Sequence, residues 1–243
     1  MKTRSSPLLK FFVSAFLILT SSTLFAQNPI DERLAAALNS PSRAIAHILR
    51  DDLRKPDEVI RFMQLPTQGA RVLDLYAAEG YYTYLLAAAV GADGRVFAQN
   101  PVAAPDADVD DIRQMHSLAD ALDERIALAQ LTNVTHLRSD FAALTASSIE
   151  PRSLDAIIMA QILHDFANAG DAPAIALLTG LRSLLKPSGT LIVIDHAGDV
   201  GQDNLRLHRM PSERAQRIAQ AAGFTLDAES TLLANPRDRH RRP

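Results

Sequence analysis

The sequence predicts an α/β fold: a doubly wound, mostly parallel sheet with helices on both faces. The first observation is that short apolar runs alternate with segments of helical spacing along most of the chain. Strands that alternate with helices of this length are joined by right-handed crossovers, which make the strands parallel. The second observation is the stretch 190–196, TLIVIDH, because an unbroken apolar run is typical of a strand covered on both faces.

Residues 1–26 are predicted to be a signal peptide and are left out of the fold. A basic start, MKTRSSPLLK, precedes FFVSAFLILT, an uncharged run too short to cross a membrane comfortably as a helix. Small residues lead to Ala26, where cleavage is expected; a retained N-terminal anchor is the alternative. The protein is therefore expected to be periplasmic or secreted, with no stable membrane span after removal of the leader.

The charge balance does not favour a nucleic-acid partner. The leader carries three of the 25 basic residues and none of the 28 acidic ones, so the rest of the chain has a formal charge of −6. The basic stretch at 234–243 is expected to be a solvated tail. Cysteine is absent, which excludes disulfides, lipid attachment and a cysteine nucleophile.

The chain is divided into an N-terminal helical extension at 27–55 and one α/β domain at 56–233. In the extension, an Ala-rich helical pattern is interrupted by NSPS, which predicts two short helices lying across the domain entrance. The domain is expected to open with a helix at Pro56, because proline and two acidic residues favour a helix start.

The remaining elements follow from periodicity. Strands are expected at 72–75, 95–98, 134–137, 156–161, 190–196 and 224–230, and helices at 81–90, 109–126, 171–185 and from Pro211 onward. Gly91 and Gly223 are expected to end helices, and Asp171 to be an N-cap. After Leu233 no apolar alternation remains, so any closing antiparallel strand is expected to be missing or altered, which leaves strand five or six with a free edge.

The ligand crevice of a doubly wound sheet lies beyond the carboxyl ends of its strands. This rule selects the loops at 74–80, 99–101, 138–141, 161–166 and 195–197.

Six fragments together resemble the class I S-adenosylmethionine-dependent methyltransferases in order and spacing, over about 56–233. They are VLDLYAAEGYYT, GRVFAQNP, LRSDFAAL, LDAIIMAQILHD, LLKPSGTLIVIDH and AAGF. The fifth fragment is the most diagnostic. The chain is most similar to an exported branch of predicted methyltransferases, in which Tyr-Tyr-Thr follows the glycine loop. The resemblance implies a Rossmann-like methyltransferase fold, S-adenosylmethionine as cofactor and a small-molecule methyl acceptor.

The resemblance also implies which residues bind the cofactor. Asp74 begins the glycine loop and helps to orient the methionine part, while Tyr76 and Ala78 occupy two glycine positions ahead of Gly80. Glycine serves there because a Cβ would collide with the ligand or disfavour the required backbone angles. Tyr76 must therefore either turn its ring away from the cofactor or close an unused site.

Two further strand ends carry cofactor candidates. Gln99 and Asn100 stand where the family has an acid that accepts the ribose hydroxyls, and losing that charge weakens binding by about tenfold. Asp140 and Phe141 match the place where the family reads adenine; a solvated acid beside a core phenylalanine is the alternative. Gln161, at the end of the fourth strand, is a further candidate.

The catalytic candidates are three histidines and a carboxylate. His164 follows strand four together with Asp165, Asp195 and His196 end strand five, and His208 follows a polar loop. One histidine is expected to act as general base. The same side chains could instead bind a divalent metal or be ordinary surface residues, and no metal is assigned.

The leading hypothesis is a methyltransferase whose acceptor and oligomeric state the residues do not reveal. The alternative is a catalytically inactive, exported binding module, favoured by Tyr76, the absent ribose acid and the shortened end. A hydrolase is disfavoured because no G-x-S-x-G motif occurs, and a dehydrogenase because G-x-G-x-x-G is absent.

Overall fold

The computed structural model describes residues 28–104, 106–144 and 148–240. The predicted signal peptide and the last three residues of the basic tail lie outside these ranges. Among the described residues, no helix has the length and apolar character needed to cross a membrane.

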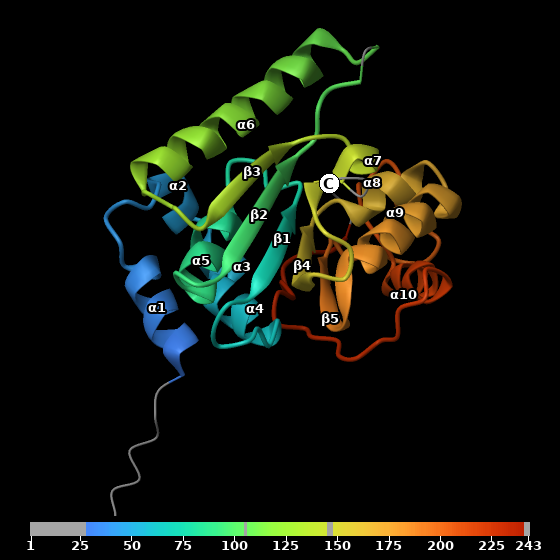
Figure 1. Ribbon diagram of the computed structural model, residues 1–243. Helices are drawn as coiled ribbons and strands as arrows, with labels where there is room; N and C mark the ends of the chain where they lie inside the picture. The colour runs from blue at the N-terminus through green and yellow to red at the C-terminus, as the bar shows by residue number, and fades with distance from the viewer. Residues whose placement is uncertain (1–27, 105, 145–147, 241–243) are drawn as a thin grey trace, which may run out of the picture.

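Five parallel strands form one sheet in the order β3-β2-β1-β4-β5 (Figure 1). They are β1 (Arg71–Leu75), β2 (Arg95–Asn100), β3 (Val134–Arg138), β4 (Leu154–Ala160) and β5 (Leu185–Ile194). Asp74 of β1 lies between Ala98 of β2 and Ile158 of β4. The strand order reverses between β1 and β4, and the crevice for a ligand is expected above that point.

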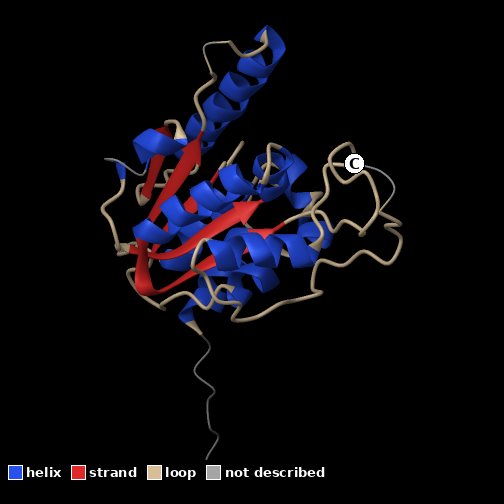
Figure 2. Ribbon diagram, turned by 90° about the vertical axis from the view of Figure 1, so that its right-hand side faces the viewer, coloured by secondary structure: helices blue, strands red, loops and turns tan. Residues whose placement is uncertain are grey.

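Helices cover both faces of the sheet (Figures 1 and 2). They are α1 (Pro29–Leu38), α2 (Ile45–Ile48), α3 (Asp51–Arg54), α4 (Pro56–Phe62), α5 (Tyr81–Val90), α6 (Val109–Leu128), α7 (Phe141–Ala143), α8 (Leu163–Asn168), α9 (Asp171–Leu184) and α10 (Ser212–Ala221). The doubly wound fold predicted from the sequence is thus confirmed.

Two separate hydrophobic cores arise because successive side chains of a strand point to opposite faces. Val72 is fully buried against α1, α4 and α5, whereas its neighbour Leu73 is fully buried against α8, α9 and α10. This two-sided burial holds β1 at the centre of the molecule. The loop that follows β1 therefore starts from the central strand of the sheet.

Three sequence predictions are wrong. The stretch 224–230 forms no strand, and Leu226 within it is 57% exposed. Asp171 is the first residue of α9 rather than its N-cap, which is Gly170. The fifth strand is not covered on both faces: β5 is an edge strand, and Val193 is 36% exposed. Because 224–230 does not pair, the free edge predicted for this end of the sheet falls on β5.

The N-terminal extension packs against the start of the α/β domain. Arg33 of α1 donates to the carbonyl oxygens of Ala88 and Ala89 at the end of α5, over 3.0 and 2.6 Å. In α3, Asp51 accepts a 2.8 Å hydrogen bond from the Tyr81 hydroxyl. Between these contacts the predicted break at NSPS separates α1 from α2.

Candidate active site

The loop after β1 keeps a backbone path suited to glycine although it contains only one. The φ angles of Tyr76, Ala78 and Gly80 are +55°, +51° and +86°. A left-handed conformation costs a non-glycine residue about 1–2 kcal/mol. Two such residues within three positions mean that the surrounding structure imposes this path on the loop.

Two buried amides hold the loop in that path. Gln99 accepts from the backbone N–H of Tyr76 over 3.2 Å and donates to the carbonyl of Ser139 over 2.8 Å. Asn100 donates to the carbonyl of Ala78 over 3.0 Å. Both side chains are buried. These two predicted cofactor residues therefore tie the ends of β1, β2 and β3 together.

Asp74 lies beneath the loop, completely buried. Its carboxylate accepts a 2.6 Å hydrogen bond from the hydroxyl of Thr83 in α5. Burial raises the pKa of Asp74 to about 7, even though the hydrogen bonds from Thr83 act in the opposite direction. The carboxyl group is consequently close to half ionised at neutral pH.

The Tyr76 ring turns toward α8 and meets Phe166 edge to face, with ring centroids 6.1 Å apart and an interplanar angle of 89°. Burial and the nearby Asp165 carboxylate raise the pKa of Tyr76. The tyrosine therefore bridges the loop after β1 and α8, the helix that carries His164.

Asp140 and Phe141 lie at the start of α7, beyond the end of β3. Asp140 is exposed and caps the helix, accepting from the backbone N–H of Ala143 over 2.6 Å. Phe141 is half-buried and packs against the same hydrophobic core as Tyr76.

His164 and Asp195 form a buried pair where β4 and β5 end. One Asp195 oxygen accepts from His164 Nδ1 over 2.7 Å and from the backbone N–H of His196 over 2.8 Å. The other oxygen accepts from the backbone N–H of His164 over 2.9 Å. These bonds fix the imidazole with its proton on Nδ1 and leave Nε2 facing away from Asp195.

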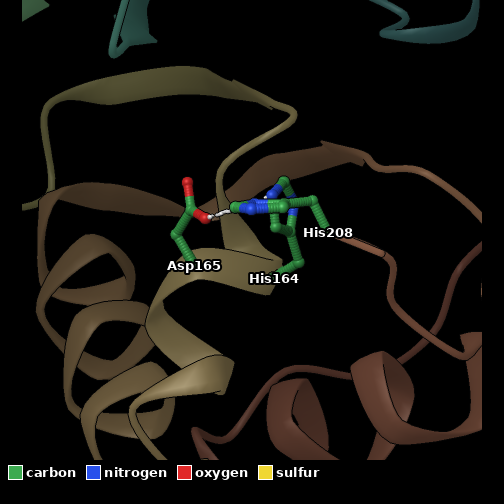
Figure 3. Close-up of side chains that lie close together, drawn as sticks. All are labelled: His164, Asp165 and His208. Carbon is green, nitrogen blue, oxygen red and sulfur yellow. Dashed lines mark ion pairs between the residues drawn. The ribbon is translucent and has the colours of Figure 1, made fainter. Parts of the chain in front are cut away.

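His208 and Asp165 complete this group. The Asp165 carboxylate lies 3.1 Å from His164 Nε2 and 3.5 Å from His208 Nδ1. The rings of His164 and His208 meet edge to face at 5.5 Å. Figure 3 shows the three side chains turned toward one another, two from α8 and one from the loop before α10.

His196 is half-buried beside this group, its ring centroid 6.5 Å from that of His164. Burial lowers its pKa, so the imidazole is neutral at pH 7. Its Nε2 lies 3.0 Å from the amide nitrogen of Gln161, which donates to it. Gln161, predicted from the sequence to bind the cofactor, therefore contacts a predicted catalytic residue.

The predicted candidates thus fall into two neighbouring groups joined by Tyr76. Asp165 was expected from the sequence to lie at the same crevice as the three histidines, as the second carboxylate beside Asp195, although it was not named as a catalytic residue. Thr83 and Phe166 were not predicted, because their roles depend on contacts across the fold.

The family model described as a methyltransferase domain matches residues 66–223. The chain belongs to this methyltransferase family. The match begins ahead of β1 and ends after α10, so it includes both groups of candidate residues. No curated protein matches the chain significantly.

Solved structures of methyltransferases share the fold. A SAM-dependent methyltransferase from Aquifex aeolicus is 22% identical with a TM-score of 0.56, and the match covers 79% of this chain and 87% of that one. A SAM-dependent methyltransferase from Leishmania major is 16% identical, with a TM-score of 0.51 and coverages of 80% and 72%.

A third structure is phosphoethanolamine N-methyltransferase 2 from Haemonchus contortus in complex with S-adenosyl-L-methionine. It is 16% identical with a TM-score of 0.53, over 70% of this chain. The match spans only 36% of the length of that enzyme. At sequence identities of 22%, 16% and 16%, these three structures show only that the chain shares their fold.

Proposed function

We propose that this protein is an S-adenosylmethionine-dependent methyltransferase that acts on a small-molecule acceptor. The observation that carries the proposal is the left-handed backbone at Tyr76, Ala78 and Gly80. The family uses glycine at these positions to let the loop pass beneath its cofactor. Here the same path is kept although Tyr76 and Ala78 are not glycine, and strained backbone of this kind clusters at ligand sites.

The residues around the loop fit the cofactor. The Tyr76 ring packs edge to face against Phe166 of α8, in agreement with the expected turn of the ring away from the cofactor. Asp74 offers a carboxylate under the loop for the methionine part, and Asp140 is an exposed acid at the place of the adenine. The side-chain amides of Gln99 and Asn100 are hydrogen-bonded to the loop backbone, so we expect them to bind the ribose more weakly than a free acid would.

The bound cofactor would supply an electrophilic methyl group on a sulfonium sulfur. This chain's own contribution is to position the acceptor and remove its proton. His196 suits the second task, since it is neutral and its Nε2 can take a proton once the amide of Gln161, which donates to it here, turns away. Tyr76 and Phe166 provide an apolar wall between the two groups of residues.

The alternative of an inactive binding module finds no support in the family match or in the related structures. We retain export as part of the proposal, on the strength of the leader sequence alone.

The test is calorimetric titration of the chain from Gln27 onward with S-adenosylmethionine and with S-adenosylhomocysteine. We expect saturable binding of one equivalent, weakened at least tenfold in Asp74→Asn. Asp93→Asn, an exposed acid at the opposite edge of the sheet, is the matched control and should bind like the wild type. Absence of heat from the wild type at millimolar ligand would refute the proposal.

A further inference from the structure

We infer that His164, Asp165 and His208 form a binding site for a divalent transition-metal ion such as Zn²⁺. The three side chains lie close together where β4 and β5 end (Figure 3), and the ring centroid of His196 is 6.5 Å from that of His164. Its use rests on the proposed function, because we expect the metal to hold the methyl acceptor. The binding itself does not depend on that function.

The spacing of the ligand atoms fits a small ion. Two ligand atoms of a tetrahedral zinc ion lie about 3.3 Å apart, given metal–ligand bonds of about 2.0–2.1 Å. The Asp165 oxygen lies 3.1 Å from His164 Nε2 and 3.5 Å from His208 Nδ1. All three ligand atoms lie within 4.8 Å of one another. Only a small approach of the two histidines would complete the set.

The ligand atoms also suit a cation between them. Asp195 accepts from Nδ1 of His164, so Nε2 is the ring nitrogen directed at Asp165, 3.1 Å from its carboxylate oxygen. A divalent cation can bind a lone pair from each of these two atoms at once. Imidazole nitrogens with one carboxylate are a ligand set used for zinc and iron.

His164 has the outer partner that metal-binding histidines have. A metal-bound imidazole almost always donates its other N–H to a carboxylate, carbonyl or water, which fixes the ring and raises its basicity. Asp195 provides this bond, and the backbone N–H groups of His164 and His196 hold the Asp195 carboxylate in turn.

His208 is fixed from the other side. Its φ is +48°, a conformation that non-glycine residues rarely adopt. The next residue, Arg209, is 4% exposed, donates to the carbonyl of Ala197 over 2.9 Å and forms a two-point ion pair with Asp238. The backbone N–H of Met210 donates to the carbonyl of His196. The loop is thus locked in the position that brings His208 to Asp165.

The site is open on one side, since the side chains of Asp165 and His208 are 49% and 59% exposed. Three protein ligands leave at least one position of a tetrahedral ion for water or for an acceptor. We therefore expect the acceptor to carry a hydroxyl group. A metal held there would ease the loss of the hydroxyl proton. That proton would pass to His196 once Gln161 releases its Nε2, the oxygen–methyl bond would form and the sulfur–methyl bond would break.

The test is titration of an untagged, chelator-treated chain from Gln27 onward with Zn²⁺, and with Co²⁺ followed by visible absorption. We expect one equivalent of Zn²⁺ and a Co²⁺ spectrum of tetrahedral intensity. His208→Ala should weaken Zn²⁺ binding at least tenfold; its side chain is exposed, so the fold should tolerate the change. His116→Ala removes an exposed histidine of α6 and should bind like the wild type.

Asp195→Asn tests the outer partner and should weaken Zn²⁺ binding by about 10–100-fold. No Zn²⁺ binding by the wild type, or equal binding by wild type and His208→Ala, would overturn the site. Titration of the same samples with S-adenosylmethionine separates the two proposals. Zn²⁺ binding without cofactor binding refutes the methyltransferase, whereas cofactor binding without Zn²⁺ refutes only the metal site.

Discussion

Replacing Asp74 with asparagine should make the protein more stable at high pH. The pKa of Asp74 is raised from 3.8 to about 7 by burial. Because the folded pKa lies above the unfolded one, the folded state holds a proton that the unfolded state releases. Wild-type stability therefore falls as pH rises from about 4 to about 7, and the loss is complete above that range. Asparagine keeps an acceptor for Thr83 and does not ionise.

The size of the expected change in unfolding free energy is worked out for the interval from pH 5 to pH 8, in which the experiment is made. Between pH 5 and the pKa of about 7, the wild type loses about 1.36 kcal/mol per pH unit relative to the variant. The difference in unfolding free energy should therefore grow by about 2.5 kcal/mol between pH 5 and pH 8. For a chain of this size that corresponds to a shift of about 1 M in the urea midpoint.

The assay is urea unfolding of wild type, Asp74→Asn and the control Asp93→Asn at pH 5 and pH 8. All other titrating groups are common to the three proteins, so they cancel in the differences. We expect the control to follow the wild type at both pH values, since Asp93 is exposed. If the unfolding free energy of Asp74→Asn changes between pH 5 and pH 8 by the same amount as that of the wild type, Asp74 is not protonated in the folded protein. That result would refute the reasoning.

Three further substitutions test the loop after β1. Gly80→Ala should lower the unfolding free energy by about 1–3 kcal/mol in urea, because φ is +86° and the new Cβ would lie 2.6 Å from a methyl carbon of Leu122; an unchanged midpoint would contradict this. Ala78→Gly should be neutral or stabilising by up to about 1 kcal/mol, since it removes the strain of a left-handed alanine, and a clear loss of stability would count against that strain. Glu79→Gln removes the ion pair with Arg50 and should lower the unfolding free energy by about 1 kcal/mol. In thermal unfolding the difference from the wild type should shrink in 1 M NaCl, and equal melting temperatures at low salt would argue against the prediction.

Local patterns predicted most of the fold. The helix expected at 81–90 matches α5, because an apolar helical run there ends at a glycine. The strand predicted at 224–230 failed because it depends on a distant partner. The alternation of its residues can be read locally, but a strand also needs a neighbouring strand, and the sequence does not reveal that β5 leaves this stretch unpaired. The same missing partner explains why the apolar run of β5 is only partly covered.

The sequence predicted which strand ends carry the candidate residues, but it did not predict how their side chains and backbone are arranged. The rule on carboxyl ends of strands selected His164 and Asp195, and His208 was added from the polar loop before it; the structure places the three together. The left-handed angles of Tyr76 and Ala78 run against the preferences of both residue types. They arise from Gln99 and Asn100, which act across the sheet from a strand that comes about 22 residues later, as the contacts show.

The contacts of the N-terminal extension make it part of the frame of the candidate site. Arg50 and Asp51 reach partners 29 and 30 residues further along the chain, and Arg33 reaches one 55 residues away. Each partner belongs to α5 or to the turn before it. A chain shortened to the α/β domain would therefore lose Arg50, the ion-pair partner of Glu79, which lies between the left-handed residues Ala78 and Gly80. The extension thus supports the loop after β1 from outside the domain that contains it.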